Sequence, residues 1–405
     1  MIDTREELIN NLTEAAELEH GLLCQYLFAA FSMKKHPADG ITWTQAERIR
    51  AWERNILEVA REEMAHLGTV SNMLTAVGGA PQFRRANFPQ PAQYFPVPSS
   101  TGVTHLEFSL QRFSLSTVER FVRFEAPDPE LQAAFAAVAP DAPEYTTVGD
   151  LYRQIEAGFE RLAGQNLFIG PQSAQDADKW TANLVIINVR DLETAKQAIQ
   201  FIIEEGEGTP VGGEESHYAK FTKIRDELRV ELAASPGFDP SWPVAPNPLT
   251  RRHPDAAAGA TIIGNEDARE VAELFNAVYG TVVLMLMQFY TFADGGRRHK
   301  ALRATIRQAM SGVIRPLGEI LVRMPIGETH PGLTAGAGFE FYTDLRLPHQ
   351  TENSWTIFLE RLVHEASECD RLSRKPEAPP RLAFLQENLE GLVRNVERYI
   401  KLGEA

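Results

Sequence analysis

The chain has 405 residues, 43% hydrophobic and 23% charged, a balance typical of globular proteins long enough for two or three domains. Its formal net charge of −15 argues against nucleic acids or anionic membranes as partners, since both would repel it. Two cysteines cannot build a disulfide framework, and no signal-peptide core or run of about 18 apolar residues occurs, so we expect a cytoplasmic protein without a membrane partner.

The first helix is expected to begin after a cap at Asp3 or Thr4 and to run to about residue 35, where it stops before a proline. Glu19 interrupts its apolar stripe at mid-helix. The second helix is expected to begin at a capping box at Thr44 and to end before Gly78. Each of these helices therefore ends at a recognisable stop signal.

A single face of the second helix carries a carboxylate and an imidazole, Glu63 and His66, one turn apart among apolar residues. A buried charge is costly unless something positive compensates it, which makes a metal ion a natural candidate. Glu62 lies on a neighbouring face and is expected to be solvated. The stripe consists of Ile56, Val59, Glu63, His66, Val70, Met73 and Val77.

A long crossover follows, because residues 81–144 are rich in proline and contain only one short expected helix, at 116–124. A connection of this length lets the third helix start from the other end of a bundle. That helix is expected over 146–163, with Glu156 among apolar neighbours. Residues 184–189 favour an extended segment.

The fourth helix is expected to start after Asp191, to break at the glycines and proline of residues 206–210, and to resume at Glu214 with His217 on its apolar face. Its metal-binding acid stays open among four candidates. Glu207 is preferred because it shares a face with Ile199 and Ile203, whereas Glu204 faces the wet side and Glu214 directly follows two glycines. The candidates are Glu204, Glu205, Glu207 and Glu214.

The second half of the chain is predicted to be helical as well, with helices at 267–292, 297–324, 354–373 and 382–401. The predicted organisation is a metal-binding bundle at 1–234, a Pro-rich linker at 235–265 and a C-terminal helical domain at 266–405. The fold class is therefore all-α: a four-helix bundle with a long crossover between helices 2 and 3, plus a C-terminal helical region.

Four helices each turn one acid toward the core, and two histidines join them. In di-iron carboxylate bundles two helices each supply a Glu and two supply Glu-x-x-His, a spacing that Glu63 and His66 fit. Oxygen-rich sites with imidazole suit iron or manganese better than zinc. The predicted metal ligands are Glu19, Glu63, His66, Glu156, Glu207 and His217.

A purely structural interpretation competes with this one, since a Glu on an apolar stripe usually pairs with a basic residue across the bundle. The chain would then be a non-catalytic helical interaction protein. The basic residues available for such pairs are Arg50, Arg54, Arg61 and Arg161.

Several sequence blocks in the first 230 residues resemble one known family. They are residues 19–27 (EHGLLCQYL), 62–67 (EEMAHL), 72–81 (NMLTAVGGAP), 204–209 (EEGEGT) and 216–221 (SHYAKF). Together they resemble the ferritin-like domain of the iminophenyl-pyruvate dimer synthase family, which includes the imine-coupling enzymes of violacein and rebeccamycin-type bisindole biosynthesis.

The resemblance implies a ferritin-like bundle with two metal ions. Some relatives are associated with haem, but nothing in this sequence marks a haem ligand. The resemblance also implies how the predicted ligands divide: Glu19 and His66 on one metal, Glu156 and His217 on the other, with Glu63 and Glu207 bridging.

The function expected from these observations is a non-haem di-iron, or manganese–iron, oxidoreductase or oxygenase that acts with O₂ on a small, amino-acid-derived substrate in secondary metabolism. The alternatives are an imine-coupling bisindole-type synthase, a ferroxidase or iron-handling protein, and the interaction protein described above. We expect a small-molecule substrate and O₂ as partners. The sequence leaves the substrate and the oligomeric state open, with a homo-oligomer among the options.

Overall fold

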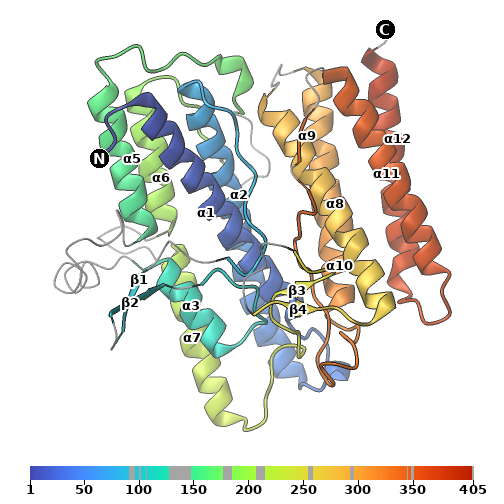
Figure 1. The fold of residues 1–405 in the computed structure, drawn as a ribbon. Coiled ribbons are helices and arrows are strands. Elements are labelled where there is room, and N and C mark those ends of the chain that lie inside the picture. The colour runs from blue at the N-terminus through green and yellow to red at the C-terminus, as the bar shows by residue number, and fades with distance from the viewer. Residues whose placement is uncertain are drawn as a thin grey trace. The chain divides into compact units, whose positions relative to one another are not determined.

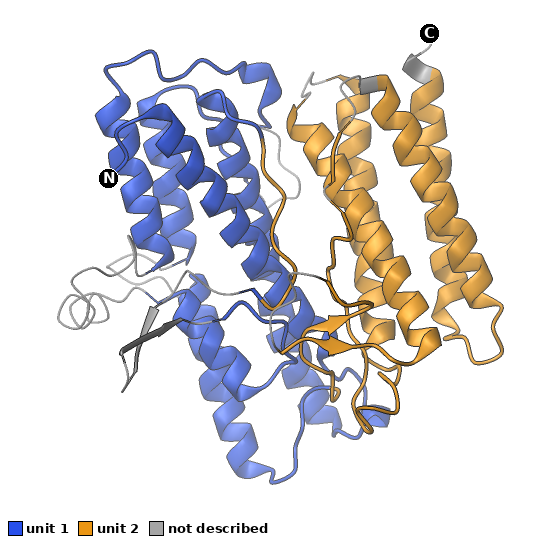
Figure 2. Cartoon of the chain, in the orientation of Figure 1, with its two compact units in different colours: residues 1–80, 90–241 blue, residues 81–89, 242–405 orange. Residues whose placement is uncertain are grey.

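The structure, a computed structural model, divides the chain into two compact units. Unit 1 comprises Met1–Ala80 and Gln90–Ser241, and unit 2 comprises Pro81–Pro89 and Trp242–Ala405 (Figure 2). The domain boundaries predicted at residues 234 and 265 stay a prediction. The residues described are 1–90, 96–99, 102–105, 107–126, 147–176, 185–206, 215–253, 259–291, 296–343, 345–347 and 351–403.

Two long helices form one layer of unit 1: α1 (Arg5–Ser32) and α2 (Trp43–Ala76), joined through the short 3₁₀ helix η1 (Pro37–Asp39). Of the two residues predicted as possible caps, Thr4 caps α1, and Glu7 completes a capping box. The predicted cap of α2 at Thr44 is wrong by two residues. Thr42 accepts a hydrogen bond from the backbone N–H of Gln45, and the Gln45 side chain accepts one from the Thr42 N–H.

The second layer consists of two short helix pairs instead of two long helices. One pair is α5 (Val148–Leu162) with α6 (Leu192–Gly206), and the other is α3 (Leu115–Phe124) with α7 (His217–Ala234). In Figure 1 the first pair lies beside the upper part of α1 and α2 and the second pair lies further down. The predicted all-α bundle with a long crossover is confirmed, and it is interrupted halfway along its second layer.

The structure corrects two local predictions in unit 1 and adds a short 3₁₀ turn. The fourth helix resumes at His217 and not at Glu214, because Ser216 caps α7 by accepting a hydrogen bond from the backbone N–H of Ala219. The crossover contains an antiparallel hairpin, β1 (Pro96–Ser99) and β2 (Gly102–His105), where no strand was expected. A 3₁₀ turn, η2 (Gln172–Ala174), follows α5.

The extended segment predicted at 184–189 does not become a strand in its described part, residues 185–189. Side chains form hydrogen bonds to its backbone, in place of the neighbouring strand that a sheet would provide. Asn72 Nδ2 donates to the carbonyl of Ile187 over 2.9 Å, and Gln175 Nε2 donates to the carbonyl of Val189 over 2.6 Å. These bonds satisfy the backbone without a ladder.

Unit 2 is also helical, and its helices match the predicted ranges closely. They are α8 (Glu266–Thr291), α9 (Arg297–Ala309), α10 (Arg315–Leu321), α11 (Thr351–Ser373) and α12 (Arg381–Gly403), with two short parallel strands, β3 (Pro248–Leu249) and β4 (Thr261–Ile262).

The helix predicted over 297–324 is interrupted by a π-helical turn, η3 (Met310–Ile314), between α9 and α10. Pro316 follows this turn and lacks the backbone N–H that a regular α-helix would need at that point. The widened turn lets the helical path continue past the proline.

Among the described helices, α8 is long and apolar enough to span a membrane, judged by length and composition alone. In its most apolar 18-residue stretch, 72% is buried inside the structure. Burial of this extent is typical of a core helix in a globular unit.

Candidate metal centre

The predicted stripe on α2 faces the core, since all seven of its side chains are buried. Glu63 is 1% exposed and His66 is 2% exposed. Apolar residues at helical spacing on either side turn this face toward the core. The two polar side chains between them are therefore buried as well. Helix periodicity alone therefore places a carboxylate and an imidazole inside unit 1.

Glu63 lies between two buried imidazoles and directs one oxygen toward each. Its Oε2 lies 3.3 Å from His66 Nδ1, and its Oε1 lies 3.0 Å from His217 Nδ1. The centroids of the two imidazole rings are 5.4 Å apart. His217 is the first residue of α7, so the interruption of the fourth helix brings this ring to the centre of the bundle.

A second carboxylate approaches each imidazole at the same nitrogen. Glu19 from α1 places Oε2 3.7 Å from His66 Nδ1, and Glu125, which caps the C-terminus of α3, places Oε2 3.6 Å from His217 Nδ1. Two groups able to hold a metal ion result, one of Glu19, Glu63 and His66 and the other of Glu63, Glu125 and His217. Glu63 belongs to both groups.

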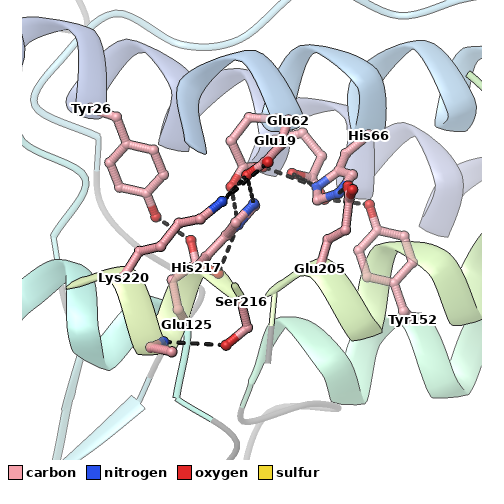
Figure 3. Close-up of polar contacts among 12 residues, drawn as sticks. Glu19, Tyr26, Glu62, His66, Glu125, Tyr152, Glu205, Ser216, His217 and Lys220 are labelled. Atoms are coloured by element: carbon pink, nitrogen blue, oxygen red, sulfur yellow. Dashed lines mark hydrogen bonds and ion pairs between the residues drawn. The ribbon is translucent and has the colours of Figure 1, made fainter. Parts of the chain in front are cut away.

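A buried tyrosine holds the remaining oxygen of each of these carboxylates (Figure 3). Tyr152 from α5 donates to Oε1 of Glu19, and Tyr26 from α1 donates to Oε1 of Glu125. Burial, followed by the charge of the neighbouring carboxylate, raises the pKa of both phenols well above its usual value, so they stay protonated and donate. Each phenol leaves the other oxygen of its carboxylate turned toward an imidazole.

An outer carboxylate meets the far nitrogen of each imidazole. Glu205 Oε2 lies 2.9 Å from His66 Nε2, and Glu62 Oε2 lies 3.1 Å from His217 Nε2. We call Tyr152, Glu19, His66 and Glu205 the first half-site, and Tyr26, Glu125, His217 and Glu62 the second half-site; both share Glu63.

The pKa values of the inner groups show that the buried carboxylates favour a proton or a positive charge beside them. Burial and the charge of Glu63 raise the pKa of Glu19 to about 8. Burial would lower the pKa of both His66 and His217, but the carboxylates around the rings outweigh it and hold both values well above normal. Burial would likewise raise the pKa of Glu63, yet its bonds to Glu19 and the imidazoles keep it below the usual range.

The donor set fits a bound metal. His217 is buried, yet neither of its ring nitrogens forms a hydrogen bond to any described residue, although carboxylate oxygens lie only 3.0 and 3.1 Å away. Buried polar atoms are rarely left in this state, and a cation between the nitrogen and the oxygens would satisfy it. His66 has the usual arrangement of a metal-binding histidine, because its Nδ1 faces the centre and its Nε2 is hydrogen-bonded to the outer carboxylate Glu205.

The structure brings together four of the six predicted ligands, Glu19, Glu63, His66 and His217. Glu156 lies outside both groups: its side chain is 25% exposed, and an oxygen lies 3.7 Å from Lys196 Nζ. The inward face of α5 carries Tyr152, Ile155 and Phe159, so Glu156 is rotated toward the edge of the bundle. Glu207 and Glu214 lie outside the described residues.

Two expectations about neighbouring acids have different outcomes. Glu204 is exposed on α6, as expected, and accepts a hydrogen bond from Gln200. Glu62 was expected to be solvated, and this is wrong: it is held between His217 and Lys220, whose Nζ lies 3.2 and 3.1 Å from its two oxygens. Lys220 is one turn beyond His217 on α7 and reaches back to α2.

Sequence reasoning missed Glu125 and the two tyrosines. Glu125 lies at the end of a short helix inside a Pro-rich crossover, where no periodic stripe indicates which side chains face inward. Tyr26 and Tyr152 do lie on predicted apolar stripes, and an aromatic residue there is usually core packing. The one available signal was that a buried phenol needs a hydrogen-bond partner, which an acid on a facing helix can supply.

The competing interpretation, in which basic residues neutralise the acids, fits Glu156, which lies near Lys196, but not the inner acids of the two groups. Arg50, Arg54 and Arg61 are exposed. Arg161 donates to the backbone carbonyl of Ile2 and pairs with Asp3 near the N-terminus. Among the described residues, the acids of the centre contact imidazoles and phenols, and Lys220 contacts the outer carboxylate Glu62.

Comparison with known proteins gives consistent results. The sequence model of one family, described as Ferritin-like, matches residues 12–226. The chain is 31% identical over 382 residues to dichlorochromopyrrolate synthase of Lentzea aerocolonigenes, which covers 84% of this chain and 36% of that protein. It is 28% identical over 366 residues to 2-imino-3-(indol-3-yl)propanoate dimerase of Chromobacterium violaceum, which covers 83% of this chain and 34% of that protein.

These relatives confirm the resemblance to imine-coupling enzymes of bisindole biosynthesis that the sequence blocks predicted. The chain spans only about a third of the length of the two relatives. Among solved structures, a ferritin-like protein from Caulobacter vibrioides is 19% identical, covers 75% of this chain and 93% of its own, and has a TM-score of 0.48.

Proposed function

The chain belongs to the ferritin-like family, and from that premise we propose that it is a metal-dependent oxidoreductase that uses O₂ to oxidise a small, amino-acid-derived molecule. The observation that carries the proposal is the position of Glu63, whose two oxygens lie 3.3 and 3.0 Å from the inner nitrogens of two buried imidazoles. A carboxylate placed in this way is suited to bridge two metal ions.

We assign the two ions to the half-sites. Glu19 and His66 would hold one, Glu125 and His217 the other, and Glu63 would touch both. Two iron ions, or an iron–manganese pair, would supply the electron-transfer chemistry with O₂ that side chains alone do not provide.

The remaining side chains of the half-sites would orient the ligands. The phenols of Tyr152 and Tyr26 fix one carboxylate oxygen each. Glu205 fixes the far nitrogen of His66, and Glu62 lies 3.1 Å from the far nitrogen of His217. Such partners set which ligand atom faces the metal and increase the basicity of the imidazole. Because the inner acids and rings are buried, water is largely excluded from them.

The substrate class follows from the relatives. One is named for dimerising 2-imino-3-(indol-3-yl)propanoate, which is an imino acid with an aromatic side chain. We therefore favour 2-imino acids of aromatic amino acids as substrates, in a biosynthetic setting. Coupling of two such molecules is the second candidate function, and the name of the dimerase favours it.

An iron-handling role is less well supported. A ferroxidase needs no organic substrate, whereas the names of the two relatives describe a synthase and a dimerase acting on organic molecules. Unit 2, which comprises more than 160 residues, also has no evident use in iron storage.

The proposal is tested by metal analysis and oxygen uptake. We expect protein purified with Fe(II) or Mn(II) to retain about two metal ions per chain and to consume O₂ when an aromatic 2-imino acid is formed in situ. Glu63→Gln keeps the shape of the side chain but removes the charge between the rings, and we expect it to lose most of the metal and the activity.

Glu47→Gln is the matched control, because Glu47 lies exposed on the same helix. It should behave like the wild type. Oxygen uptake that depends on Fe(II) alone, with no effect of imino acids and with deposition of ferric mineral, would instead indicate iron handling. Protein that retains no metal under any of these conditions would exclude both functions.

A further inference from the structure

The two half-sites contain the same types of contact, made by side chains from different helices. A tyrosine on α5 holds the inner acid of α1, and a tyrosine on α1 holds the acid that follows α3. Likewise an acid on α6 meets the imidazole of α2, and an acid on α2 meets the imidazole of α7. A site built on such a repeat would bind two equal cations unless some side chain makes its halves different.

Lys220 is the side chain that differs between them. Its ammonium group lies 3.1 and 3.2 Å from the two oxygens of Glu62, in the second half-site (Figure 3). Glu205, the corresponding acid of the first half-site, has His66 as its only cationic partner among the described residues. Lys220 is 8% exposed at its side chain, so solvent screens its charge only weakly.

This ammonium group acts on the second half-site in two ways. Its positive charge repels a cation held by His217, and at intermediate dielectric a unit charge several ångströms away changes an ion's affinity about ten- to hundredfold. It also holds Glu62 in an ion pair, and Glu62 forms no hydrogen bond to His217 Nε2 although its Oε2 lies only 3.1 Å away. Lack of such an outer partner typically weakens a bound metal about ten- to hundredfold. Both effects weaken the same half-site.

We propose that Lys220 makes the centre bind its two metal ions in order, first in the half-site of Glu19 and His66 and then, more weakly, in the half-site of Glu125 and His217. This inference rests on the proposed metal centre. Lys220 acts through Glu62 and through its charge and is a positioning residue. Ordered filling would let one position hold a resident ion while the other stays exchangeable.

The test is a titration of metal-free protein with Co(II), followed by visible absorbance and by calorimetry. Wild type should bind two ions in steps whose affinities differ at least tenfold. Lys220→Met should tighten the second step about tenfold or more and leave the first nearly unchanged. Lys223→Met changes an exposed lysine of the same helix and should leave both steps as in the wild type.

The outer acids identify the two steps. Glu205→Gln should weaken the tight step and Glu62→Gln the weak one. The proposal is overturned if wild type binds two ions equally, if Lys220→Met leaves the ratio unchanged, or if the two Gln variants act in the opposite order; in each case the metal centre itself would stand. No cobalt binding at all would overturn the centre as well, which separates the two failures.

Discussion

His217 Nδ1 lies 3.0 Å from Glu63 Oε1, although the two residues come from helices far apart in the sequence. The contact depends on the interruption of the fourth helix, since His217 is the first residue of α7 and Ser216 caps that helix. In a continuous helix each side chain is rotated by about 100° from the one before it, so the residues before position 217 would fix the direction of its side chain. The break frees the ring to face α2 and completes the pair of imidazoles around Glu63.

The tyrosines should act on one metal each. Replacing Tyr152 by Phe removes the phenol that fixes Glu19, and replacing Tyr26 by Phe does the same for Glu125. We expect each variant to weaken one of the two Co(II) binding steps about tenfold, and a different step in each case. Tyr218→Phe, beside His217 on α7, is the control. Equal weakening of both steps by both variants would contradict the assignment to separate half-sites.

Glu125 and Glu156 should differ in their importance for metal binding. Glu125 is buried beside His217, whereas Glu156 lies at the edge of the bundle near Lys196. We expect Glu125→Gln to retain about one metal ion per chain after desalting, and Glu156→Gln to retain about two. Elemental analysis by mass spectrometry measures both. Loss of metal in Glu156→Gln with full loading of Glu125→Gln would show that the third-helix ligand is the one predicted from the sequence.

The metal-free protein should become less stable as the pH rises. The folded protein keeps a proton on Glu19 up to about pH 8, whereas the unfolded chain releases it near the normal value of 4.5. The raised pKa values of His66 and His217 act in the same direction, so their contribution is present at low pH and is lost at high pH. Glu63 has a lowered pKa and titrates below this window.

Thermal melts in chelator between about pH 5.5 and 8 measure this dependence, and the melting temperature should fall across the window. Glu19→Gln, whose amide does not titrate, should reduce the slope. Added metal should reverse the trend, because deprotonated ligands bind it more tightly. A melting temperature that rises with pH in chelator would show that these groups are not protonated in the folded protein.

Sequence periodicity alone determined most of the helices and the inward face of α2. Ile56, Val59, Val70 and Met73 lie on the same face of α2 as the two polar residues. Because this apolar face packs against the core, Glu63 and His66 are buried with it. Glu19 was predicted on the same ground from α1. Helix boundaries were less certain, as the shift from Thr44 to Thr42 illustrates, since several residues near a helix start can accept the capping hydrogen bond.

Only the tertiary structure decided which acid completes the second half-site. Glu156 lies on a predicted apolar stripe, but α5 rotates so that Ile155 faces the core and Glu156 does not. Glu125 has no stripe to predict it, because it follows a short helix whose direction depends on packing against α7. Local patterns fix the face of a long helix, whereas the ends of short helices are placed by contacts with distant parts of the chain.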